Sequence, residues 1–128
     1  MQHHRIVAVA VAVLTAALLA RHAAAADEYA PLPVPLQIQQ APAAPIYYSI
    51  GHPGVPGKQN EGNTSNAGFV VTPDGVLVFD ALGTPSLGWA LLQDIRKITD
   101  KPVRYVALSH YLADHIYGLQ AFRDHTGA

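Results

Sequence analysis

The feature that most constrains the fold is a tight turn between two apolar runs near the middle of the chain. Residues 67–72 and 76–80 are rich in β-branched and aromatic side chains, and Pro73-Asp74-Gly75 separates them. Proline presets φ for a turn and glycine accepts φ above zero, so this segment has the residues that a tight turn needs. The pattern predicts a β-hairpin.

A helix and a further strand follow the hairpin. Apolar side chains recur at helical spacing after Thr84, which is placed to cap a helix, and Pro85 suits the first helical position. We expect this helix over about residues 85–99. Residues 103–108 form an apolar run that is typical of a buried strand. Strand, helix and strand in this order predict a βαβ unit with a parallel strand pair, and hence an α/β fold.

A second helix is expected at the end of the chain. It should begin near Asp114 and carry Ile116, Leu119 and Phe122 on its inner face, since these apolar residues recur at helical spacing.

The sequence has a different character upstream of the hairpin. Residues 27–45 hold five prolines and predict an extended leader. Residues 46–50 are a short β-rich run, and glycines and prolines crowd the stretch from there to about Ser65. Such a stretch excludes a helix or a central strand, so we expect a strand and then a mobile loop. The domain therefore spans residues 46–128.

The first 26 residues have the composition of an export signal. Arg5 precedes an apolar run over residues 6–20, and three alanines that end at Ala26 supply small residues for cleavage. The run is shorter than the ~20 residues that span a bilayer. We therefore predict a cleaved signal peptide over residues 1–26, a periplasmic or secreted protein, and no stable membrane anchor.

Charge and residue usage exclude several classes of function. The chain has 8 Lys and Arg against 9 Asp and Glu, without a basic run, so it lacks the electrostatic footprint of a nucleic-acid-binding surface. It has no cysteine, and therefore no disulfide, thiolate metal site or cysteine nucleophile. Glycine-rich phosphate-binding motifs and the Gly-x-Ser-x-Gly elbow are also absent from the sequence.

One short segment carries candidate chemistry. The strand expected over residues 103–108 is followed by Ser-His-Tyr-Leu-Ala-Asp-His, in which His110, Asp114 and His115 fall within six residues. Alternate residues of an extended loop point to one side, and residues at a helix start project together, so a short segment can present donors to adjacent cations. Imidazole nitrogen and carboxylate oxygen are donors that suit zinc.

The same segment resembles the His-x-His-x-Asp-His signature of the metallo-β-lactamase superfamily, and the preceding hairpin, helix and strand match as well. The turn Asp80-Ala81-Leu82-Gly83 resembles the turn that follows the family's hairpin. Within the superfamily, the segment is similar to exported zinc metallohydrolases associated with quinoprotein systems, including the sulfur-oxidation-linked type. The resemblance covers residues 46–128. It implies the N-terminal half of an αββα sandwich, with the inner face of one sheet uncovered.

The resemblance also implies roles for individual residues. An intact family member binds two zinc ions, which assigns His110 to the first ion and Asp114 and His115 to the second. Asp114 would in addition have a catalytic part, because the family's aspartate orients the attacking water. Asp80 would form a hydrogen bond to the metal-binding loop. Leu112 stands where the family has a second histidine, and leucine has no lone pair to donate, so one ligand is lost.

Other roles stay open for these residues. Asp114 is well placed as a helix N-cap, which needs no metal. His115 fits a partly buried position in a first helical turn, His110 fits a solvated loop, and Leu112 fits a core contact. His52, in the Gly- and Pro-rich loop, could overhang a substrate site as loops in this family do.

Together these observations predict an exported zinc-dependent hydrolase of metallo-β-lactamase type that acts on a small-molecule substrate. The later ligands and the second half of the sandwich are expected beyond residue 128, so the chain is expected to be inactive by itself. Two alternatives differ in class: a non-catalytic accessory or binding protein of a quinoprotein or sulfur-oxidation pathway, and a gene fragment without function.

Overall fold

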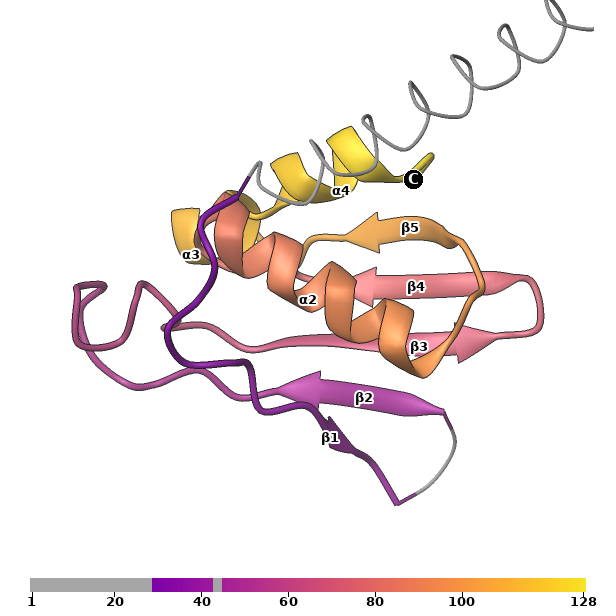
Figure 1. Ribbon diagram of the computed structural model, residues 1–128, viewed down its shortest axis with the longest axis horizontal. Coiled ribbons are helices and arrows are strands. Elements are labelled where there is room, and N and C mark those ends of the chain that lie inside the picture. The colour runs from indigo at the N-terminus through magenta and orange to yellow at the C-terminus, as the bar shows by residue number, and fades with distance from the viewer. Residues whose placement is uncertain (1–28, 43–44) are drawn as a thin grey trace, which may run out of the picture. The chain divides into compact units, whose positions relative to one another are not determined.

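The computed structural model of the protein describes residues 29–42 and 45–128 (Figure 1). The predicted signal peptide, residues 1–26, lies outside the described residues. Residues 31–128 form one compact unit, which holds the sheet and the helices discussed below. Among the described residues, no helix is long and apolar enough to cross a membrane.

The unit is built on a five-stranded sheet whose strands lie in chain order. The strands are β1 (Gln39–Gln40), β2 (Ile46–Ser49), β3 (Ala67–Thr72), β4 (Gly75–Phe79) and β5 (Val103–Ala107). Strands β1 to β4 pair antiparallel, and β5 pairs parallel to β4. A parallel edge strand after a helix is the product of a βαβ crossover, so the predicted α/β class is confirmed.

The hairpin and the long helix form where the sequence predicts them. Strands β3 and β4 are joined at Pro73 and Asp74, and Gly75 has a φ of 148°, a value that side chains with a Cβ rarely adopt. Helix α2 (Pro85–Ile98) has proline at its start, and Thr84 Oγ1 accepts a hydrogen bond from the Leu87 backbone N–H at 3.1 Å. The helix therefore begins with the expected cap.

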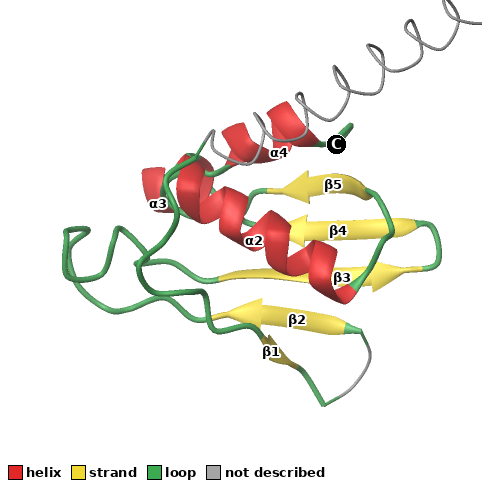
Figure 2. Ribbon diagram, in the orientation of Figure 1, coloured by secondary structure: helices red, strands yellow, loops and turns green. Residues whose placement is uncertain are grey.

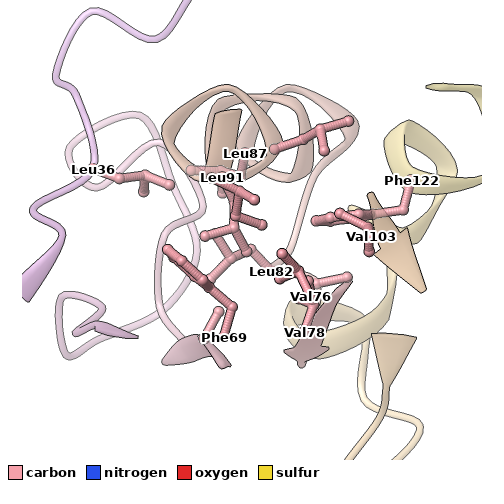
Figure 3. Close-up of a cluster of buried hydrophobic side chains, with 13 residues drawn as sticks. Leu36, Phe69, Val76, Val78, Leu82, Leu87, Leu91, Val103 and Phe122 are labelled. Atoms are coloured by element: carbon pink, nitrogen blue, oxygen red, sulfur yellow. The ribbon is translucent and has the colours of Figure 1, made fainter. Parts of the chain in front are cut away.

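The core lies between one face of the sheet and α2 (Figures 2 and 3). Alternate residues of β3 and β4, such as Phe69 and Val78, point to this face and are fully buried. Helix α2 supplies the opposing stripe, and Phe122 closes the cluster from the C-terminal helix. The helix residues buried in the cluster are Leu87, Leu91, Leu92 and Ile95.

The segment expected to be an extended leader takes part in the fold. Over the described part of this segment, Gln39 and Gln40 form β1 at the edge of the sheet, beside Tyr48 and Tyr47 of β2. Leu36 is buried against the core cluster. The chain before residue 46 thus extends the sheet by one short strand and covers part of the core.

The C-terminal region differs from the prediction of one helix that begins near Asp114. It contains two short helices, α3 (Ala113–Ile116) and α4 (Leu119–His125). The break falls at Gly118, whose N–H donates to the Leu82 carbonyl at 3.0 Å, and a Cβ there would lie 1.8 Å from the Ala81 carbonyl oxygen. This close approach redirects the chain, and α4 then buries Phe122 as expected.

Candidate functional site

The candidate site lies at the edge of the sheet where the parallel strands β4 and β5 end (Figure 2). Asp80 follows β4 directly, and Ser109 and His110 lie in the loop between β5 and α3. Carboxyl ends of parallel strands point to one edge, so residues far apart in the sequence meet there. The Ala81 backbone N–H donates a hydrogen bond to the His115 carbonyl oxygen at 2.9 Å. This bond connects the turn after β4 to α3.

Asp80 is the centre of a hydrogen-bond network at this edge. Its side chain is buried, and the Ser109 backbone N–H donates to Oδ1 at 2.7 Å. The Ser109 hydroxyl lies 2.7 Å from Oδ2, and His115 Nδ1 lies 2.8 Å from the same oxygen. The Asp80 backbone has a φ of 61°, a left-handed conformation that aspartate tolerates better than most residues. This conformation turns the carboxylate back toward the loop after β5.

The network holds the pKa of Asp80 below its ordinary value of 3.8. Burial by itself raises this pKa because it disfavours the charged form. The hydrogen bonds from the Ser109 N–H, the Ser109 hydroxyl and His115 outweigh burial, and the charge interaction with His115 adds to them. Asp80 is therefore a carboxylate at neutral pH.

An ionised Asp80 fixes the proton positions of both histidines. A carboxylate only accepts hydrogen bonds, so Ser109 Oγ–H and His115 Nδ1–H must be the donors. The single hydroxyl proton of Ser109 is then used, so Ser109 Oγ accepts from Nδ1–H of His110, 2.7 Å away. Neutral His110 and His115 both keep the lone pair on Nε2, which is the arrangement found in metal-binding histidines.

Asp114 and His115 lie close enough to share a cation. Asp114 Oδ2 is 3.7 Å from His115 Nε2, and two donor atoms on a tetrahedral zinc ion lie about 3.3 Å apart. The long loop before β3 helps to place Asp114, because Thr64 Oγ1 lies 3.5 Å from Asp114 Oδ2 and Ser65 Oγ donates to the Asp114 carbonyl oxygen. The centroid of the His110 ring lies 4.0 Å from that of His115.

The candidate ligand atoms are of the types that bind zinc, but there are too few of them to complete a zinc site. Imidazole nitrogen and carboxylate oxygen are zinc ligands, and structural zinc sites use four of them. Within the described residues, no three side chains among His, Asp and Glu converge as they do around a bound metal ion. Asp114 and His115 present two ligand atoms, Oδ2 and Nε2, that lie 3.7 Å apart.

Leu112 and His52 differ in their relation to the site. Leu112 lies at the N-cap position of α3 with 51% of its surface exposed, so the alternative of a core contact is wrong. The alternative that Asp114 caps this helix is also wrong, since Asp114 lies within the first turn and no side chain caps α3. His52 lines a separate small cavity of about 50 Å³ beside Asn60 and Leu87.

Three polar residues that organise the site were not predicted from the sequence. Ser109 joins Asp80 to His110, while Thr64 and Ser65 reach Asp114 from the long loop. The position of Ser109, directly before the His-rich segment, was the available signal. Thr64 and Ser65 lie about 50 positions from Asp114 in a stretch without periodicity, so only the tertiary fold brings them there.

A groove of about 550 Å³ runs from the site onto the sheet face opposite α2. Asp80 and His115 form one end of the groove, and Tyr48, Gly68 and Phe79 line it on the sheet. The candidate site is therefore open to solvent along an apolar surface.

Comparison with known proteins relates this chain to one superfamily. The model of the metallo-beta-lactamase superfamily matches residues 60–128, which include β3 to α4 and the whole candidate site. The chain is also similar to a linear primary-alkylsulfatase from Pseudomonas sp. (strain ATCC 19151), with 32% identity over 54 residues. That match covers 42% of this chain and 10% of the alkylsulfatase.

The chain belongs to the metallo-β-lactamase superfamily, since the family model covers more than half of its length. The family is hydrolytic in type, and the predicted resemblance is confirmed. The matched segment spans about a tenth of the alkylsulfatase, so the similarity concerns only a small part of that enzyme.

Proposed function

We propose that the chain carries part of the active site of a zinc-dependent hydrolase that acts on a small molecule. The observation that carries the proposal is the network in which Asp80 and Ser109 direct the Nε2 lone pairs of His110 and His115 outward. A network that served stability alone would not require a lone pair for metal binding on both Nε2 atoms.

Asp114 and His115 would hold one zinc ion, and His110 would contribute to the site of a second zinc ion beside it. Zinc in such a site supplies a nucleophilic water near neutral pH. The residues of this chain would orient the donors: Asp80 fixes the imidazole of His115, and the long loop fixes Asp114 through its carbonyl group. Leu112 supplies no donor, so further ligands must come from outside these residues before hydrolysis can occur.

We also propose that the protein is exported. The support is the apolar run over residues 6–20 with Arg5 before it and the small residues that end at Ala26. Export places the site in a periplasmic or extracellular compartment. The absence of cysteine is compatible with that environment, where free thiols oxidise.

A second candidate function is a non-catalytic binding protein, and the substitution at Leu112 favours it. The half-exposed Leu112 side chain makes no helix-capping bond and does not belong to the core, so its contribution to stability does not explain its presence. Loss of a ligand position would remove hydrolysis and leave the groove able to bind. Hydrolytic activity separates the two candidates.

Zinc titration of the purified chain by calorimetry tests the metal site. We expect one zinc ion to bind with a Kd weaker than about 1 µM, because two donors leave a tetrahedral shell unfilled. Asp114→Asn and His115→Gln should abolish this binding. Asp74→Asn and His52→Gln change the same residue types outside the site and should leave it intact.

The position of Leu112 supplies a further comparison. Leu112→His adds a donor beside His110 but no complete shell, so the zinc affinity of the 128-residue chain should change by less than about tenfold. Sub-micromolar binding by the unaltered chain, or equal binding by Asp114→Asn and its control, would contradict the proposed site.

A further inference from the structure

The long loop, residues 50–66, joins β2 to β3 and closes on itself (Figure 1). Two hydrogen bonds join its ends. The Gly51 N–H donates to Asn66 Oδ1 at 3.0 Å, and the His52 N–H donates to the Asn63 carbonyl oxygen at 2.8 Å. Loops whose ends lie together and whose own side chains fill them act as compact units. The conformation of this loop therefore depends on the side chains in its interior.

The carboxamide of Asn60 organises the interior of the loop. Asn60 is 8% exposed, and its Oδ1 accepts hydrogen bonds from the Gly57 N–H at 2.9 Å and from the Gly62 N–H at 3.1 Å. Its Nδ2 donates to the Val55 carbonyl oxygen at 3.0 Å. A carboxamide supplies both the acceptor and the donor that these backbone groups need. Removal of the carboxamide would take this partner from two N–H groups and one carbonyl group.

The chain turns from Asn60 directly toward Asp114. Glu61 and Gly62 have φ values of 55° and 74°, and two successive left-handed residues reverse the direction of the chain. The loop then meets the candidate site at Gly83. A Cβ added to Gly83 would lie 3.0 Å from the Gly62 carbonyl oxygen and 3.1 Å from the Asp114 Cα, so the three backbones are packed closely together.

We propose that Asn60 is a positioning residue for Asp114 and acts through the loop, an inference that rests on the proposed function of Asp114 as a zinc ligand. Asn60 fixes Gly62, and only two residues separate Gly62 from Ser65. The hydroxyl groups of Thr64 and Ser65 lie against the carboxylate and the carbonyl group of Asp114, respectively. Coupling between two sites is reciprocal, so a zinc ion that fixes Asp114 also stabilises the loop.

NMR spectra of the metal-free 128-residue chain test the positioning directly. We expect Asn60→Ala to shift the amide and carboxyl signals of Asp114, because the two hydroxyl groups move with the loop. Signals of the hairpin turn at Asp74 should stay in place and show that the sheet is folded. Asn60→Asp keeps the acceptor for both N–H groups, so it should shift the Asp114 signals less. Gln59→Ala removes an exposed carboxamide from the same loop and should leave them unchanged. Unchanged Asp114 signals in Asn60→Ala would overturn the proposal.

Limited proteolysis and zinc titration test the reciprocal effect. Lys58 is exposed within the loop, so trypsin can cleave there when the loop opens locally. We expect saturating zinc to slow cleavage after Lys58 at least about fivefold, and Asn60→Ala to raise the Kd for zinc by a similar factor. Asp114→Asn should remove the protection. Cleavage after Lys97, in α2, reports global unfolding and serves as the control.

The outcomes separate this inference from the proposed function. Zinc binding that leaves cleavage after Lys58 unchanged would contradict the coupling, and so would equal zinc Kd values for Asn60→Ala and Gln59→Ala. If the chain binds no zinc but Asn60→Ala still displaces the Asp114 signals, the positioning by Asn60 is supported and only the proposed function is refuted.

Discussion

Asp80 links the end of one strand to the loop after the next, and it does so with one buried carboxylate. Hydrogen bonds to a charged group are worth more than neutral ones, and a buried partner left without its bond costs the full desolvation of that group. The left-handed backbone at Asp80 adds a second requirement, because most side chains are strained there. The residue therefore has both a conformational and an electrostatic reason to be aspartate.

Replacing Asp80 with asparagine should lower stability in a pH-dependent way. The pKa of Asp80 is lower in the folded state than its ordinary value of 3.8, so its stabilising contribution is present above about pH 4 and is lost as the pH falls through the folded-state pKa. We expect Asp80→Asn to cost about 2 kcal/mol at pH 7 and to lose less stability than the unaltered chain between pH 4 and pH 2. Urea unfolding at several pH values measures both effects.

The same variant should change the proton position on His115. The side-chain amide that Asp80→Asn introduces would place a donor where the carboxylate has only acceptors, so His115 Nδ1 would accept and the proton would move to Nε2. Nitrogen chemical shifts of the imidazole report this exchange directly. A loss of stability without a change of tautomer would show that Asp80 stabilises the fold but does not determine the proton position on His115.

Site residues differed in how far the sequence could predict them. His110, Asp114 and His115 could be selected because imidazole and carboxylate groups clustered within a few positions. Ser109 could not, because serine is common in loops, and its role here is to accept a hydrogen bond from one histidine while it donates one to Asp80. That dual use depends on three-dimensional geometry, and no spacing in the sequence encodes it.

At the scale of elements, the turn after β4 and the link between α3 and α4 form one packed unit. The Gly118 N–H donates to Leu82, and the Ala81 N–H donates to His115, so two backbone bonds join the segments. A Cβ on Gly88 of α2 would lie 2.2 Å from the Gly118 carbonyl oxygen. Two glycines thus let α2, the turn and the link approach one another at backbone distance, and the His-bearing loop depends on this contact.

Replacing Gly118 with alanine should therefore be severe. Its φ of −68° is ordinary, so the cost comes from contact alone: the new Cβ would lie 1.8 Å from the Ala81 carbonyl oxygen. We expect Gly118→Ala to lower the free energy of unfolding by at least about 3 kcal/mol in urea denaturation. Gly127→Ala meets nothing within 4 Å and should change it by less than about 0.5 kcal/mol. Equal effects of the two substitutions would refute the packed unit.

The sequence predicted well those elements that a few neighbouring residues determine. The Pro-Asp-Gly turn fixed the hairpin, and Thr84 with Pro85 fixed the start of α2. The break at Gly118 had no local cause that could be recognised, because a glycine between apolar residues also fits a continuous helix. The need for it arises from the backbone of the turn after β4, which the sequence places more than 30 positions away.

The whole folded unit is a sheet with apolar residues on both faces and helices on only one (Figure 1). The core side is closed by α2 and α4, whereas the sheet face opposite α2 presents Phe79 and Tyr105 to solvent. Hydrophobic stabilisation scales with the apolar area removed from water, so the described residues gain stability from one face of the sheet and not from the other. The stability of such a unit is then linked to whatever covers its second face.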